Sequence, residues 1–152
     1  MIPFSAVCVF CEDIREEKSG QDTIIGTLPD NLVAAKPLSL APSPNVARPF
    51  LPRMGAYMRI HFDADQDIPK DVSAKVINMD GQVVAHSTWD QSTIDKTFAD
   101  SRANHMPVVG LIFKLVIAPF PLTFEGGKIT VVAMVDGVER VAGALNVIVS
   151  TA

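Results

Sequence analysis

Alternation of apolar and polar residues is the feature of this sequence that most limits what the chain can fold into. The clearest stretch is residues 56–62, whose side chains divide between two faces: Ala56, Met58, Ile60 and Phe62 on one, and Tyr57, Arg59 and His61 on the other. Successive side chains of a β-strand point to opposite sides, so this pattern predicts a half-buried antiparallel strand. Strands of this kind need a second sheet to cover their apolar face.

Turn signals separate further stretches of the same kind. Asp80–Gly81 and Asp136–Gly137 suit tight hairpins, because glycine tolerates a positive φ and aspartate is among the few other residues that do. They predict one hairpin over residues 71–89 and another over residues 128–149. The only tryptophan, Trp89, follows the first of these hairpins and is expected to anchor the core.

Two further segments complete the expected core. Residues 90–104 are the one plausible helix, because Ile94 and Phe98 stand one helical turn apart on a thin apolar stripe. Residues 108–118 are expected to form the most buried strand, because both of its faces are apolar. Val109, Leu111, Phe113, Leu115 and Ile117 lie on one face, and Val108, Ile112 and Val116 lie on the other. Two apolar faces predict a central strand that is covered on both sides, by the helix, a proline-rich segment or another subunit.

Residues 29–53 are a different kind of segment, with six prolines among alanine, serine, leucine and asparagine. Proline cannot donate to a strand ladder and disfavours helix, so the segment is expected to be an extended connection. Its larger apolar residues predict that part of it lies against the sheet as an edge strand, or reaches a second subunit as an arm; they are Leu38, Leu40, Phe50 and Leu51.

Together these patterns predict an all-β protein, an Ig-like antiparallel β-sandwich of about seven to eight strands with at most one short connecting helix. The 152 residues suit a single domain over residues 1–152, with residues 29–53 as the proline-rich connection.

Composition argues against two classes of partner. The net charge is -4 and the lysines and arginines are scattered, whereas nucleic-acid binding rests on clustered positive charge, so no nucleic acid is expected. The N-terminus has no basic residue before its apolar stretch, and no apolar run approaches the roughly 20 residues that span a bilayer. No membrane contact is expected, and the prediction is a soluble cytoplasmic protein.

The two cysteines, Cys8 and Cys11, have the spacing of a Cys-x-x-Cys motif. On a strand, an offset of three residues places the two side chains on opposite faces, and no second cysteine pair or nearby histidine completes a tetrahedral site. We therefore expect two buried thiols that act as small apolar side chains.

The first expected hairpin, residues 5–28, carries a dense charged run between its apolar strands. The run covers residues 12–18 and is followed by a Ser19–Gly20 turn. One interpretation is a solvated hairpin end whose charges protect an edge strand from aggregation. The other makes Asp13, Arg15 and Glu16 a recognition patch that projects from the sandwich.

The same hairpin resembles the opening of a family of small bacterial proteins, a domain of unknown function. The likeness lies in residues 11–20, which read Cys-Glu-Asp-Ile-Arg-Glu-Glu-Lys-Ser-Gly, and in residues 23–26, which read Thr-Ile-Ile-Gly. It is clear over this hairpin and looser over the C-terminal one. The resemblance implies a compact β-sandwich and supplies no activity, because the function of the family is itself unassigned.

Asp63, Asp65 and Asp67 are the residues of this chain that most resemble a ligand set. Alternating carboxylates in one loop can converge on calcium, whose oxygen ligands are often drawn from one short segment. The helix-loop-helix calcium pattern is not met, because it needs glycine at its sixth position and glutamate at its twelfth, where this chain has Ile68 and Ala74. A calcium site between sandwich loops stays open, with Asp80 or Asp136 from another loop.

Signatures of the common enzyme families are missing from the sequence. There is no Gly-x-Ser-x-Gly, no phosphate-binding glycine loop and no His-Glu-x-x-His, and no catalytic residue is assigned. We therefore expect a non-enzymatic binding module without a cofactor, which contacts a protein partner or itself as a homo-oligomer. Two alternatives stay open: a calcium-dependent module resembling C2 sandwiches, and an enzyme whose site is assembled from distant residues.

Overall fold

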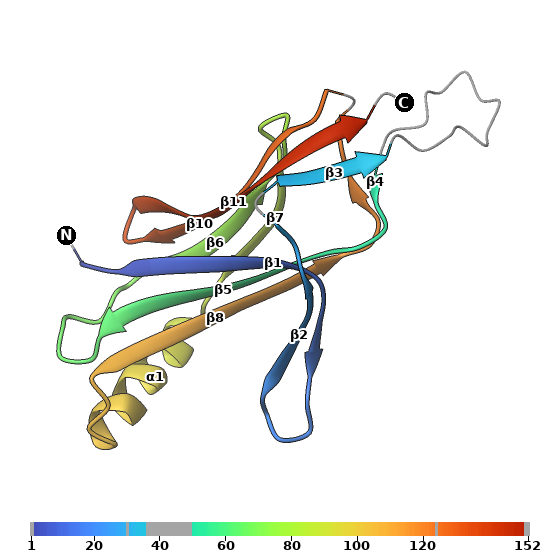
Figure 1. Ribbon diagram of the computed structural model, residues 1–152. Helices are drawn as coiled ribbons and strands as arrows, with labels where there is room; N and C mark the ends of the chain where they lie inside the picture. Colours follow the sequence, from blue (N-terminus) through green and yellow to red (C-terminus); the bar gives the residue numbers. More distant parts are fainter. Residues whose placement is uncertain (1, 30, 36–49, 124, 151–152) are drawn as a thin grey trace.

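Two stacked β-sheets make up most of this protein (Figure 1). The computed structural model describes residues 2–29, 31–35, 50–123 and 125–150. In chain order the elements are β1 (Ser5–Glu16), β2 (Asp22–Thr27), β3 (Asn31–Ala35), β4 (Phe50–Leu51), β5 (Met54–Asp63), β6 (Val72–Ile77), β7 (Val83–Thr88), α1 (Gln91–Ala103), β8 (Val108–Ile117), β9 (Phe120–Pro121), β10 (Gly127–Val135) and β11 (Val138–Ser150).

One sheet has four strands in the order β2-β1-β5-β8, and the other has five in the order β3-β11-β10-β6-β7. A two-stranded ribbon, β4-β9, completes the described part of the chain. All pairings are antiparallel except that of β3 with β11. The predicted all-β sandwich with one short helix is confirmed, and the strand number is higher than expected because residues 29–53 and 118–121 add three short strands.

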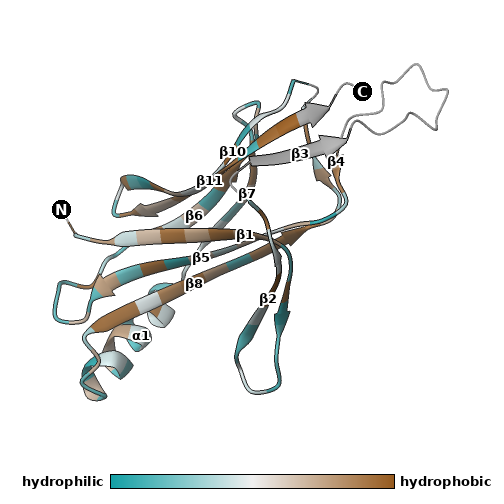
Figure 2. Cartoon of the chain, in the orientation of Figure 1, coloured by the Kyte–Doolittle hydropathy of each residue, from teal (hydrophilic) through white to brown (hydrophobic). Residues whose placement is uncertain are grey.

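The core lies between the two sheets, and strands of both sheets supply its apolar side chains (Figure 2). On β5 the predicted apolar face is buried, with Met58 and Ile60 fully covered. Trp89 is half-buried and its ring centroid lies 6.4 Å from that of Phe113. Both Asp-Gly turns connect hairpins, β6 with β7 and β10 with β11, as predicted from local turn chemistry.

The helix closes the sandwich beside β8. Its two predicted anchors, Ile94 and Phe98, are fully buried, and the Phe98 ring centroid lies 5.6 Å from that of Phe62 on β5. The first turn is closed by the backbone, because the Ile94 N–H donates to the Asp90 carbonyl at 3.1 Å, while the Asp90 side chain makes no capping bond.

The prediction that β8 is a central strand is wrong. β8 pairs with β5 alone, so within the described residues it is the edge of the four-stranded sheet. Its inner face is buried as expected, but the outer residues Val108, Ile112 and Val116 are 48%, 40% and 37% exposed. The apolar residues on the outer face of β8 are therefore not covered by a further layer of the described residues.

The β1–β2 hairpin bends out of the four-stranded sheet. Cys11 is the turning point, since it pairs with Gly55 of β5 on one side and with Thr27 of β2 on the other. Beyond it, β1 pairs only with β2, and Figure 1 shows the hairpin running past β8 and ending beyond it. The predicted hairpin over residues 5–28 is thus an arm as well as part of the sheet.

Part of the proline-rich connection lies against the sheets, as expected. β3 adds to the edge of the five-stranded sheet in parallel with β11, and β4 pairs with β9, which buries Leu51 and leaves Phe50 exposed. Leu38 and Leu40 lie outside the described residues. The described residues contain no helix that is long and apolar enough to cross a membrane.

Candidate binding surfaces

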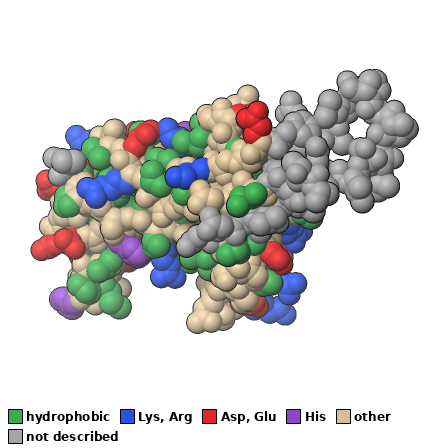
Figure 3. Space-filling view, turned by 45° about the horizontal axis from the view of Figure 1, so that its top comes forward, with side chains coloured by type: hydrophobic (Ala, Val, Ile, Leu, Met, Phe, Trp, Pro, Cys, Tyr) green, Lys and Arg blue, Asp and Glu red, His purple; other side chains and the backbone are tan. Residues whose placement is uncertain are grey.

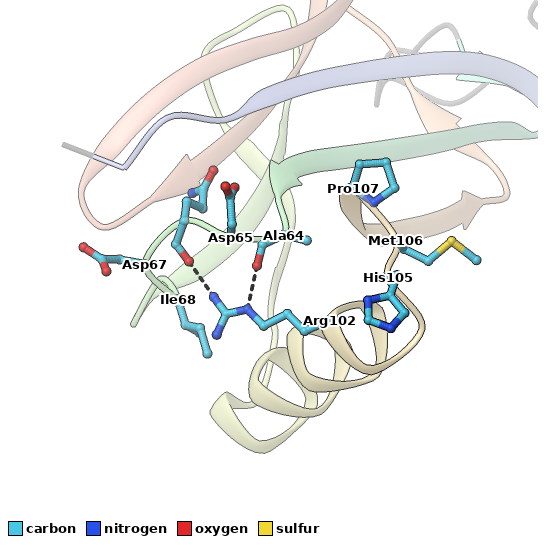
Figure 4. A pocket seen from close by; sticks show the side chains of 9 residues that line it. Ala64, Asp65, Asp67, Ile68, Arg102, His105, Met106 and Pro107 are labelled. Atoms are coloured by element: carbon cyan, nitrogen blue, oxygen red, sulfur yellow. Dashed lines mark hydrogen bonds between the residues drawn. The ribbon is translucent and has the colours of Figure 1, made fainter.

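The acidic loop after β5 is held by an arginine from the helix. Arg102 donates from Nε to the Ala64 carbonyl and from Nη2 to the Gln66 carbonyl, each at 2.6 Å (Figure 4). Gln66 in turn accepts the Asp63 N–H through its Oε1 at 2.9 Å. The guanidinium thus donates hydrogen bonds to two carbonyl oxygens of the loop and places a positive charge beside the loop.

The structure does not gather Asp63, Asp65 and Asp67 into a ligand set. All three are exposed, and no group of three or more His, Cys, Asp or Glu side chains that could hold a metal ion occurs in the part of the chain that is described. The carboxylates expected from other loops are engaged elsewhere: Asp136 accepts the N–H groups of Lys70 and Asp71 at 2.9 and 2.8 Å, and Asp80 accepts that of Gln82 at 3.1 Å. The expected calcium site therefore gains no support from the geometry.

An open hollow of about 970 Å³ lies between this loop and the end of the helix. Its walls are residues 64–68 on one side and Arg102 with residues 105–107 on the other (Figure 4). Met106 is 57% exposed there, and the Arg102 guanidinium carbon lies 5.5 Å from the Phe98 ring centroid. The hollow combines acidic side chains with apolar ones. No local pattern in the sequence indicates the role of Arg102, because its partners lie 36 and 38 residues away.

The predicted recognition patch is divided between the two faces of β1, because successive side chains of a strand point to opposite sides. Asp13 and Arg15 line a hollow of about 500 Å³, in which the Asp13 carboxylate pairs with Arg53 at 3.0 Å. Glu16 lies elsewhere and pairs with Lys114 of β8 at 2.7 Å. The three residues therefore do not form one site.

Lys114 joins the hairpin to the outer face of β8. Its Nζ also lies 2.9 Å from Oδ1 of Asp22, which is 12% exposed in its side chain. Hydrogen bonds to Glu16 and Asp22 raise the pKa of Lys114. The one charged residue of β8 is thus neutralised by the acidic hairpin.

The outer face of the four-stranded sheet carries five exposed aliphatic residues, all from β1 and β8. They are Val7, Val9, Val108, Ile112 and Val116. Between them, on β5, Arg59 lies against Tyr57, with its guanidinium carbon 5.6 Å from the ring centroid and Nη2 donating to the phenol oxygen at 3.2 Å. In the sequence, Val7 and Val9 belong to an apolar stretch, and no local signal separates them from core residues.

The two thiols lie on opposite faces of β1, as predicted, since Cys8 is opposite Met58 and Cys11 is opposite Gly55. Burial raises the pKa of Cys8 to about 12 and also raises the pKa of Cys11, which is fully covered. Both cysteines are free. Cys11 is buried as expected, and Cys8 is only partly buried. Protonated thiols in these positions suit a packing role better than redox chemistry.

Comparison with known proteins adds no identification: no family model matches the chain, and no curated protein matches it. The resemblance of the N-terminal hairpin to a family of small bacterial proteins stays a prediction.

Proposed function

We propose that this protein is a non-enzymatic interaction module that binds a protein partner on the β8 side of its four-stranded sheet. The observation that carries the proposal is the exposed aliphatic face formed by Val7, Val9, Val108, Ile112 and Val116. Exposed apolar residues that gather on one face of a protein commonly mark an interaction site.

The composition of the face fits a protein partner. Val7 and Ile112 flank Arg59 across the sheet, and Arg59 lies over Tyr57. Arginine and tyrosine are enriched where protein interfaces concentrate their binding energy. Tyr57 is 7% exposed, so its ring supports the face, while Arg59 is exposed and available to an incoming group. The acidic hairpin borders the same face at Lys114.

The edge of β8 adds a second means of binding. Its backbone pairs with β5 over all ten residues without a register shift, and the other edge is not paired by any described strand. An unpaired strand edge offers a row of N–H and C=O groups to an extended partner segment. Side-chain and backbone recognition therefore meet on the same side of the molecule.

Site-specific photo-crosslinking in the host cell tests the proposal. A photoreactive phenylalanine is placed at Ile112 or Val116, and at Val83 or Val141 as matched controls, which are 53% and 63% exposed on the other sheet. The proposal predicts discrete crosslinked products from positions 112 and 116 and none from the controls. Equal crosslinking at all four positions, or none at 112 and 116, would contradict it.

A further inference from the structure

We propose that the partner is a second copy of this chain, joined through antiparallel pairing of β8 with β8 about a two-fold axis at Ile112. The inference rests on the proposed function, because it names the occupant of the same surface. It follows from the length of the edge, its charge, the register and the position of the hairpin.

β8 is the edge strand that is least protected against pairing. The other edges of the two main sheets are β2 and β7, with six residues each, and β3 with five, whereas β8 has ten. The pairing of β7 is also broken by a register shift. Proteins commonly protect their edges by short strands, bulges or charges, and β8 has only Lys114, which is already paired with Glu16 and Asp22.

The register follows from the outer face. Directly opposed residues of an antiparallel pair lie on the same face of the sheet, so outer residues must meet outer residues. With the axis at Ile112, Val108 lies opposite Val116 of the second copy, and Ile112 lies opposite its own counterpart. Lys114 then lies opposite Gly110, which has no side chain to oppose it.

Neighbouring registers are less favourable. An axis at Leu111 places Lys114 opposite Val108, and an axis at Phe113 places it opposite Ile112. An axis at Lys114 brings two lysines directly together, which is destabilising. Only the Ile112 axis pairs all three exposed aliphatic residues of β8 with one another.

The hairpin is placed to hold the second copy. It reaches beyond β8, and Figure 3 shows a hollow at the lower rim of the molecule, between the part with α1 and the part with the β1–β2 hairpin. In the proposed register, Lys114 of one copy faces Gly110 of the other, which pairs across its own sheet with His61, next to Arg59. Glu16 and Asp22 would therefore approach basic residues of the second copy.

Variants that each add one cysteine to the native Cys8 and Cys11 test both the occupant and the register. Opposed residues of an antiparallel pair have Cα atoms about 4.5–5.5 Å apart, which allows a disulfide. Ile112→Cys should therefore form a covalent dimer under mild oxidation. Val108→Cys and Val116→Cys should form a covalent dimer only when the two variants are mixed, because residue 108 of one copy lies opposite residue 116 of the other. In either variant alone, the two introduced cysteines are eight residues, or about 27 Å, apart along the strands. Wild type and Val83→Cys, on the β7 edge, are the controls and should stay uncrosslinked.

The substituted positions are partly exposed, so the variants should keep the wild-type melting temperature, which is measured first. The inference would be overturned if Val108→Cys or Val116→Cys alone crosslinked as readily as their mixture. It would also be overturned if Val83→Cys crosslinked as readily as Ile112→Cys. Absence of an Ile112→Cys dimer would overturn it too. If position 112 still gave a photo-crosslink to a different protein, the proposed function would stand and only the second copy would be excluded.

Discussion

The Nζ of Lys114 lies 2.7 Å from Oε1 of Glu16, although the two residues are 98 positions apart in the chain. This ion pair fixes the end of the β1–β2 hairpin over the outer face of β8. It neutralises the one charge on that strand and marks where the arm meets the proposed interface. The hairpin is therefore part of the binding surface as well as part of the sheet.

The ion pair should stabilise the folded protein at neutral pH and lose this effect at alkaline pH. The raised pKa of Lys114 means that the folded state binds this proton more tightly than the unfolded chain does. The ion pair therefore contributes fully to the free energy of unfolding below the unfolded-state pKa of about 10.4. This contribution is lost as the pH rises through the folded-state pKa. Wild type should exceed Lys114→Met in free energy of unfolding at neutral pH, and the difference should shrink above about pH 10.4. Urea denaturation at a series of pH values measures it, and a difference that grows with pH would contradict the assignment.

The thiols should be unreactive in the folded protein. Since burial raises the pKa of Cys8 to about 12 and raises that of Cys11, little thiolate forms near neutral pH. Iodoacetamide at mildly alkaline pH should modify the native protein slowly and the protein in guanidinium rapidly, at both residues. Mass spectrometry after timed quenching gives the rates, and fast native modification of either cysteine would refute the packing role.

Gly143 should be a position where a methyl group is not tolerated. An added Cβ would lie 3.0 Å from the Cβ of Cys8 and 3.2 Å from its carbonyl oxygen, where the two sheets approach each other. Gly143→Ala should lower the free energy of unfolding by about 1–3 kcal/mol, as overpacking does. Gly110→Ala is the matched control in a strand, since its nearest neighbour would be a His61 carbon at 3.8 Å, and it should be close to neutral. Equal effects of the two substitutions in denaturant titrations would show that the close approach is not what requires glycine.

Calcium should leave thermal stability unchanged. Asp63, Asp65 and Asp67 are not gathered, and Arg102 holds the carbonyl oxygens of Ala64 and Gln66. A ligand that binds only the folded state raises the melting temperature by mass action. Calorimetry with millimolar calcium and with chelator should therefore give the same melting temperature, and a reproducible rise with calcium would restore the cation-dependent alternative.

Local features of the fold were predictable from the sequence, because they depend on neighbours in the chain. The alternation in residues 56–62, the turns at Asp80–Gly81 and Asp136–Gly137, and the helix anchored by Phe98 all fall where the patterns indicate. Each is decided within a few residues, by side-chain period or by turn chemistry.

Non-local features were not predictable in the same way. Apolar residues on both faces of residues 108–118 do not say whether a further layer exists, and here the outer face is exposed. The partners of the charged residues were equally hidden: Asp13 pairs with Arg53, and Arg102 reaches a loop 36 residues or more away. Such contacts depend on how sheets and helix meet, which no short pattern records.

Sedimentation equilibrium tests dimerisation through β8 directly, because it measures the molar mass of the protein in solution from low micromolar to near-millimolar concentration. Wild type should be a dimer at the upper concentrations, and Ile112→Lys, which changes a 40% exposed side chain at the proposed axis, should be a folded monomer. Val141→Lys, on the other sheet, should dimerise like wild type. A wild type that stays monomeric throughout, or an Ile112→Lys variant that dimerises equally well, would contradict the account.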